Sequence, residues 1–132
     1  MSCSSAIYGV NTSSTAIADG GTYPINTVVR RFGCRCQLSN NAITLSGSGY
    51  YDVAVSGTFT STAVGKITMS VYQNGTLIPG MSATQTISTA GDIVSLNTSG
   101  MVRTNCSSST ITVVISGQAV TGTNLAVDVT RQ

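Results

Sequence analysis

The most chemically distinctive stretch of the sequence is VVRRFGCRCQL, residues 28–38. Three of the five arginines and two of the four cysteines fall within these eleven positions. Arginines and thiols this close together suit four kinds of site. These are a catalytic centre, a thiolate metal site, a nucleic-acid patch, and a contact with another protein chain.

The residue composition argues against catalysis. The chain has no histidine, no glutamate and no tryptophan, and charged residues make up only 8% of it. Typical soluble domains have about 25%. Histidine, the commonest general base near neutral pH, is therefore missing. The carboxylates are four separated aspartates, Asp19, Asp52, Asp92 and Asp128. We expect no catalytic residues, and hence a protein that is not an enzyme.

The four cysteines are candidates for disulfides and poor candidates for a metal. Zinc sites favour Cys-x2–4-Cys spacing and often add histidine, whereas this chain offers Cys-x-Cys and no histidine. On a strand, Cys34 and Cys36 would lie about 6.6 Å apart, near the upper limit for a bridge. Pairing with Cys3 or Cys106, in the same or an adjacent subunit, fits better. The alternative left open is that all four are reduced and pack as small apolar residues.

The arginines point to protein contacts more than to nucleic acid. A nucleic-acid surface needs a broad basic footprint, but the chain has six basic residues and a net charge of +2. Arg30 and Arg31 would point to opposite faces of a strand. One of them would then share a face with Val28 and Phe32, and would need a carboxylate or carbonyl partner from a neighbouring subunit. Solvent exposure at a strand end is the alternative. The residues predicted for attachment or inter-subunit contact are Arg30, Arg31, Arg35, Cys34 and Cys36.

The elements that would position these residues are strands. Good helix formers are scarce, and apolar residues alternate with polar ones in YYDVAVSG, KITMSVYQNG, TITVVISG and NLAVDVT. Asn74-Gly75 between two apolar runs is a strong hairpin signal. Weaker strands are predicted at 6–10, 27–32, 42–46, 76–80, 83–88 and 92–96.

Eight to ten short strands separated by turns predict an all-β antiparallel sandwich or barrel. Residues 1–26 have a softer pattern and are expected to form a less regular N-terminal arm for attachment. Residues 27–132 are expected to form the domain. Tyr50 and Tyr72 alternate with apolar neighbours, so they are candidates to face outward and stack on a sugar. Asp92, in a Gly-Asp turn, is expected to bond turn amides.

Four segments follow one another in an order that resembles the jelly roll of the C1q and tumour-necrosis-factor superfamily. They are GYYDVAVSGTF (49–59), KITMSVYQNGTLIPG (66–80), AGDIVSLNTSG (90–100) and NLAVDV (124–129). One departure is Val53, where the family has a second aromatic. The resemblance implies a C1q/TNF-like jelly roll and a homotrimer whose inner sheets pack around a threefold axis. The residues that it places in the core or at the trimer interface are Tyr51, Val53, Val55, Leu125 and Val127.

The whole chain also resembles small prophage-encoded, virion-associated proteins of Gram-positive bacteria. This resemblance implies a trimeric capsid decoration or auxiliary protein, similar to a head fibre, on the virion exterior. Such a protein would be produced in the bacterial cytoplasm and would bind the major capsid protein or another virion protein. It would need no cofactor, no metal, no nucleic acid and no membrane. The alternative is a receptor-binding module of a phage tail or cell-surface fibre, recognising a host-surface glycan or protein.

Overall fold

The computed structural model describes residues 5–33, 35–104 and 108–131 and contains only strands and connecting turns. The expectation of an all-β antiparallel jelly-roll sandwich is confirmed. The twelve strands of the described residues are β1 (Ala6–Asn11), β2 (Thr15–Ile17), β3 (Thr22–Tyr23), β4 (Thr27–Phe32), β5 (Cys36–Ser39), β6 (Ala42–Leu45), β7 (Gly49–Thr60), β8 (Gly65–Gln73), β9 (Thr76–Ile87), β10 (Ile93–Thr104), β11 (Ser109–Ser116) and β12 (Val120–Arg131).

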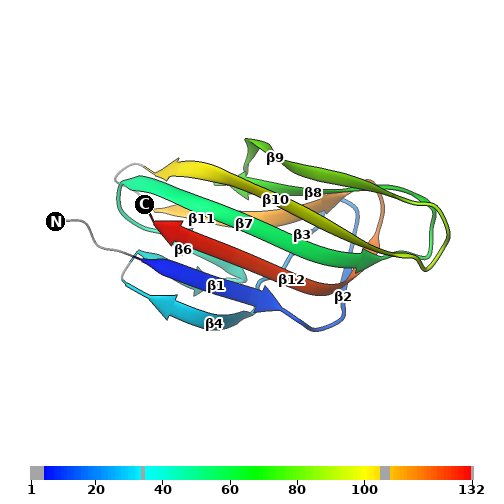
Figure 1. The fold of residues 1–132 in the computed structure, drawn as a ribbon, viewed down its shortest axis with the longest axis horizontal. Coiled ribbons are helices and arrows are strands. Elements are labelled where there is room, and N and C mark those ends of the chain that lie inside the picture. The colour runs from blue at the N-terminus through cyan, green and yellow to red at the C-terminus, as the bar shows by residue number, and fades with distance from the viewer. Residues whose placement is uncertain (1–4, 34, 105–107, 132) are drawn as a thin grey trace.

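The strands form two antiparallel sheets that face each other (Figure 1). Sheet A has the order β10-β7-β12-β1-β4, and β2 adds to β12. Sheet B has the order β5-β6-β11-β8-β9, and β3 adds to β11. From β9 to β12 the chain crosses to the other sheet at every connection. This crossing brings strands that are distant in sequence side by side and gives the jelly roll its topology.

The core lies between the sheets because alternate side chains of each long strand point inward. In β7 the odd-numbered residues Tyr51, Val53, Val55 and Phe59 are buried, and the even-numbered residues between them face solvent. The rings of Tyr23 and Phe59 meet edge to face, with centroids 5.6 Å apart. Most of the other buried side chains are aliphatic. The alternation seen in the sequence thus marks the inner faces correctly.

The N-terminal segment differs from the expected separate arm. β1 lies inside sheet A and pairs with β12 along one side and with β4 along the other. Ile7 is buried in β1, and Tyr23 and Ile25 are fully buried further along the chain. The expected boundary at residue 26 therefore falls within the sandwich. The polar run at 11–22 hid this, because its backbone pairs with distant strands that a local pattern does not reveal.

One turn and one bulge set the register between β8 and β9 in sheet B. Asn74-Gly75 closes the β8–β9 hairpin with positive φ at both residues, as predicted from the Asn-Gly pair. The two strands expected at 76–80 and 83–88 are one strand, β9. Pro79-Gly80 falls where the β8–β9 register shifts, so it makes a bulge and not a break. β9 is the edge strand of sheet B, where a proline needs no partner for its nitrogen.

Candidate functional site

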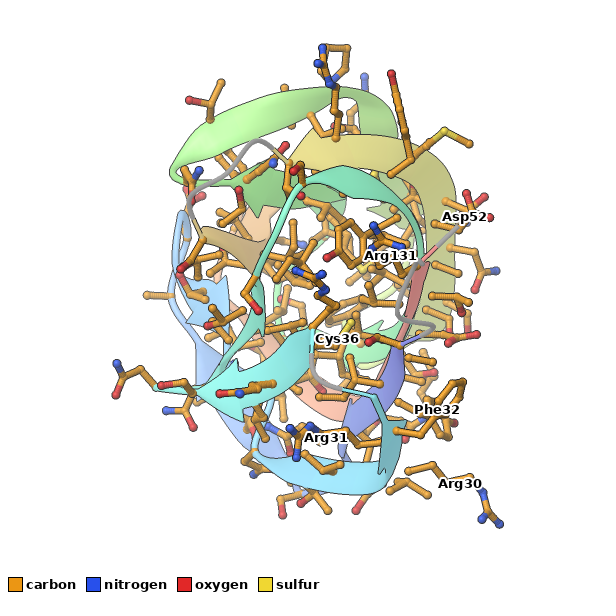
Figure 2. All side chains as sticks on the ribbon, turned by 90° about the vertical axis from the view of Figure 1, so that its left-hand side faces the viewer. Arg30, Arg31, Phe32, Cys36, Asp52 and Arg131 are labelled. Atoms are coloured by element: carbon orange, nitrogen blue, oxygen red, sulfur yellow. The ribbon has the colours of Figure 1, made fainter. Side chains whose placement is uncertain are left out.

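Arg30 and Arg31 lie on opposite faces of β4, as strand geometry predicts. The Arg31 side chain lies on the same face of sheet A as Ile7, at the exposed edge of the sandwich, and its Nε donates a hydrogen bond to the Cys36 carbonyl oxygen at 2.7 Å. Arg30 is opposite Tyr8 in the β1–β4 register and points away from the sandwich (Figure 2). The carbonyl partner that was expected from a neighbouring subunit is, for Arg31, supplied by its own chain.

Arg35 and Arg131 pack against the loop at residues 46–48, at the end of the sandwich shown in Figure 2. The Arg35 guanidinium lies directly over Gly47, so closely that a side chain at 47 would overlap it. Arg131 donates from Nη2 to the Ser48 carbonyl at 3.0 Å. The Tyr51 hydroxyl donates to the Ser46 carbonyl at 2.9 Å. These side chains fix the loop of this end, which we call the terminal end because the first and last described residues meet there.

Cys36 is a free thiol that is completely buried in the core. Burial raises the pKa of the Cys36 thiol to about 11, although the nearby Arg31 partly opposes this. The pKa of the Tyr51 hydroxyl is also raised, chiefly by the burial of Tyr51 itself and to a smaller extent by the nearby Cys36. A thiol of this kind is a small packing residue with little thiolate at neutral pH. Cys3, Cys34 and Cys106, the other cysteines considered for disulfides, lie outside the described residues.

The residues assigned to the core or the trimer interface are all enclosed within the protomer. They come from the two adjacent central strands β7 and β12 of sheet A, which pair directly. Any subunit contact on β7 and β12 would therefore involve the alternate residues of these strands, whose side chains face outward. The five enclosed residues are Tyr51, Val53, Val55, Leu125 and Val127.

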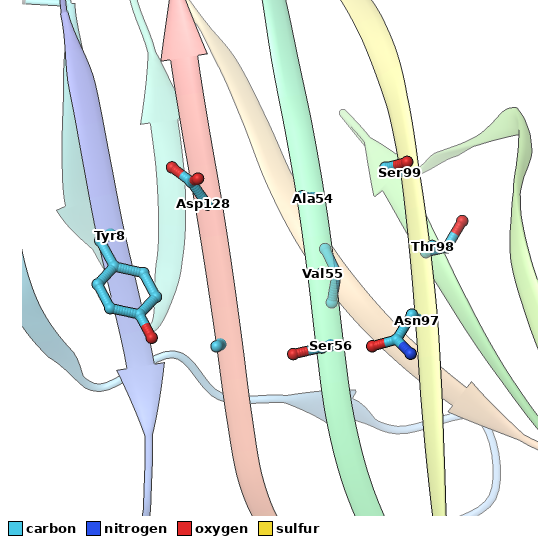
Figure 3. A pocket seen from close by; sticks show the side chains of 9 residues that line it. Tyr8, Ala54, Val55, Ser56, Asn97, Thr98, Ser99 and Asp128 are labelled. Atoms are coloured by element: carbon cyan, nitrogen blue, oxygen red, sulfur yellow. The ribbon is translucent and has the colours of Figure 1, made fainter.

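The outward face of sheet A is hollowed over its central strands (Figure 3). The hollow has a volume of about 500 Å³. Its floor is formed by small side chains, among them Ala54 and Ser56 of β7, Ala126 of β12 and Ser99 of β10. Tyr8 and Asp128, which are opposite each other in the β1–β12 register, border it on one side. We call this surface the outer face of sheet A.

A second, smaller hollow of about 210 Å³ adjoins the first one across Tyr8. Ala6 and Tyr8 of β1 and Phe32 of β4 give it apolar walls, and Arg30 and Asp128 give it a polar rim. We call it the aromatic socket. Every residue of β4 is exposed, including Val28, Val29 and Phe32, and Phe32 exposes 59% of its surface. Valine and phenylalanine side chains gathered on one strand are seldom left uncovered in this way.

Tyr50 and Tyr72 differ in their exposure. Tyr50 faces outward from sheet A and exposes 50% of its surface, whereas Tyr72 is half-buried on sheet B. Around Tyr72, the outward side of sheet B carries paired hydroxyls, such as Thr68 with Thr84 at 3.0 Å and Ser70 with Ser82 at 3.1 Å. Tyr50 is thus the better placed of the two rings for stacking on a ligand.

Asp92 bonds the turn between β9 and β10, as predicted, because its carboxylate accepts the Thr89 amide at 3.2 Å. Nowhere in the described part of the chain do three or more His, Cys, Asp or Glu side chains gather into a group that would hold a metal ion. The described residues also form no helix long and apolar enough to cross a membrane.

Comparison with known proteins identifies the fold. The sequence matches no family model and no curated protein. Solved structures do match. Murine APRIL superposes with a TM-score of 0.74 at 14% identity, over 96% of this chain and 98% of that one. Eiger TNF from S. frugiperda gives 0.73 at 10% identity, over 98% and 91% of the two chains.

The globular domain of zebrafish complement 1qA protein superposes with a TM-score of 0.64 at 8% identity, over 96% of this chain and 94% of that one. The chain has the C1q/TNF-like jelly-roll fold. The superpositions span 96–98% of the chain. In this C1q/TNF-like jelly roll, β1 is an integral part of sheet A.

Three residues that the sequence did not single out belong to these surfaces. Tyr8 and Asp128 border both hollows, and Arg131 fixes the terminal end. The alternation of NLAVDVT offered a signal for Asp128, since it assigns that side chain to the face opposite Val127. The same alternation assigns the Tyr8 side chain to the face opposite its neighbour Ile7. The sequence offered none for Arg131, because its partner loop lies more than eighty residues away.

Proposed function

We propose that this chain is a non-enzymatic structural protein that assembles as a homotrimer through the outer face of sheet A and decorates the exterior of a phage particle. The observation that carries the proposal is the outer face itself. Its floor consists of small side chains, and large exposed apolar residues surround it on both sides. Tyr8 and Phe32 flank it on the β1–β4 side and Met101 lies on β10 at the other edge, while Tyr50 and Ile93 are exposed at opposite ends of the β7–β10 pair.

Small side chains let another sheet approach closely, and exposed apolar residues at the border gain free energy when a partner covers them. The composition supports the same conclusion. A chain with 8% charged and 41% hydrophobic residues has few groups to keep a large free surface soluble. Burial of one face in each of three copies would remove much of that surface from water.

The phage role draws on the resemblance of the whole chain to small virion-associated proteins. The placement of the terminal end is compatible with it. The backbone of Arg131 donates to the Ser5 carbonyl at 2.9 Å, so both ends of the described chain meet at one end of the sandwich (Figure 1). If that end docks on the shell, the sandwich projects outward. Adhesion to the major capsid protein would then be the mechanism, with no reaction catalysed.

Three measurements test the proposal. Light scattering or native mass spectrometry should give three times the chain mass, and a stable monomer at micromolar concentration would refute the trimer. Imaging of purified particles should place the protein on the capsid in a fixed number of copies. Deletion of the gene should leave host adsorption unchanged.

The alternative is a receptor-binding module of a tail or a cell-surface fibre. The half-exposed ring of Tyr50 is the observation that favours it, because exposed aromatic rings stack on sugar faces. This alternative predicts a tail-tip location. It also predicts that deletion of the gene abolishes adsorption, and that Tyr50→Ala weakens binding to host cells without changing the oligomeric state.

A further inference from the structure

A closed ring of three identical subunits needs two different patches on each copy, because the contact runs from the front of one subunit to the back of the next. The outer face of sheet A has two such patches, one at each side. One is the aromatic socket between β1 and β4. The other lies on β10, the strand at the opposite edge of the sheet. The inference that these two patches contact each other rests on the proposed homotrimer.

The β10 patch consists of Met101 and Arg103. Both point outward from sheet A, since they are opposite Asp52 and Tyr50 of β7. Met101 exposes 57% of its surface, which is unusual for a long apolar side chain on a regular strand. Residues two apart on a strand share a face and lie about 6.6 Å apart. The patch therefore presents an apolar side chain and a cation side by side.

The aromatic socket offers the matching pair of groups. Its walls, Ala6, Tyr8 and Phe32, enclose about 210 Å³, which is room for one side chain. Asp128 lies on its rim directly across from Tyr8 in the β1–β12 register. Cross-strand neighbours of this kind lie about 5 Å apart. The socket thus presents an apolar hole and a carboxylate at a separation similar to that of Met101 and Arg103.

We infer that Met101 of one copy fills the aromatic socket of the next copy and that Arg103 of the first copy pairs with Asp128 of the second. A methionine adapts its shape to an irregular hole and makes favourable sulfur contacts with aromatic rings. The arginine fork matches a carboxylate. The two contacts act together, because Met101 seated in the aromatic socket also excludes water from the Arg103–Asp128 ion pair beside it.

Within one copy the Asp128 carboxylate is left for a partner. Arg30 shares the rim of the socket, but Tyr8 stands between Arg30 and Asp128 in the register of β4, β1 and β12. Among the described residues, no ion pair or hydrogen bond engages the Asp128 side chain. Arg30 of the same copy is therefore the alternative partner for the Asp128 carboxylate, and an experiment can distinguish it from Arg103 of a neighbouring copy.

The test is a charge exchange between positions 103 and 128, read out as trimer dissociation by sedimentation or native mass spectrometry over a dilution series. Arg103→Asp and Asp128→Arg should each raise the dissociation constant about tenfold or more, because each places like charges together. The double variant R103D/D128R should recover most of the wild-type affinity. The matched control R30D/D128R should not.

Methionine variants supply the second measurement. Met101→Leu should keep the trimer, whereas Met101→Glu should dissociate it, with the circular dichroism spectrum unchanged in both. A wild type that is monomeric would overturn the trimer and this pairing together. A stable trimer in which R103D/D128R dissociates no less than its single variants would overturn the pairing alone. So would recovery by R30D/D128R, which would assign the contact to Arg30.

Discussion

The Arg31 side chain bridges the two sheets at their open side, since its Nε donates to the Cys36 carbonyl at 2.7 Å. Arg31 belongs to β4, the edge strand of sheet A, and Cys36 begins β5, the edge strand of sheet B. The loop between them reverses the chain from one sheet to the other. The guanidinium thus gives the Cys36 carbonyl a charged hydrogen-bond donor.

Arg31→Met should therefore lower the free energy of unfolding by about 1–2 kcal/mol, because it leaves the Cys36 carbonyl without its charged donor. Arg30→Met is the matched control, with the same substitution one residue earlier on the outer face. Guanidinium titrations at several protein concentrations would separate folding from association. Equal losses in the two variants, extrapolated to the protomer, would contradict the role of this hydrogen bond.

Cys36 should resist alkylation in the folded protein at pH 8, since burial raises its pKa to about 11 and leaves almost no thiolate. Because the unfolded thiol ionises first, this residue's contribution to stability is complete below the ordinary thiol pKa. It is lost as the pH rises through about 11. Peptide mapping after iodoacetamide treatment would measure the protection, with the guanidinium-unfolded protein as the reactive control. Rapid labelling of Cys36 in the native state would contradict it.

Tyr23→Phe should stabilise the protein by about 1 kcal/mol. The Tyr23 hydroxyl is buried and has no hydrogen-bond partner among the described residues, so folding removes it from water without a replacement there. Burial also raises its pKa to about 12, so stability is lost as the pH rises from the ordinary tyrosine value through about 12. Thermal melts at pH 7 and pH 11 would test both effects. A destabilised Phe variant would show that the hydroxyl has a partner, such as a buried water.

Gly122→Ala should destabilise the protein by about 1–3 kcal/mol through overpacking. A Cβ at this position would lie 2.4 Å from the Tyr23 ring, which is fully buried and has no free space to retreat into. In a Tyr23→Leu background the same substitution should cost less, because the clashing ring atoms are gone. A double-mutant cycle by chemical denaturation measures this coupling. If the free-energy losses of Gly122→Ala and Tyr23→Leu simply add, the Tyr23 ring is not the cause of the destabilisation.

Ala54→Arg should prevent assembly without unfolding the protomer, because it places a long cation on the floor of the hollow. Thr112→Arg is the matched control on the outward side of sheet B, where we expect no subunit contact. Molecular mass in solution measures the outcome, and circular dichroism confirms that both variants fold. Trimers of normal stability in Ala54→Arg would exclude the outer face of sheet A as the interface.

Much of the fold could be predicted from the sequence because burial in a strand alternates. The patterns around Val53, Met69, Val113 and Val127 placed four long strands and their inner faces correctly, and Asn74-Gly75 placed a hairpin. These signals are local, so no partner strand is needed to detect them. The same parity marks Asp128 as outward, although its neighbours on that face were not evident.

The tertiary structure decided which distant elements meet. Only strand pairing put β1 between β12 and β4, which changed residues 6–11 from an expected arm into part of sheet A. Only the closure of the sandwich brought Arg31 to the Cys36 carbonyl and left Arg30 on the outer face. The sequence by itself determined the alternation, the scarcity of charge and the lack of histidine, because these are properties of residue type and order. The hollows depend on side chains from up to four strands at once, and that arrangement exists only when nonlocal pairing has fixed the registers.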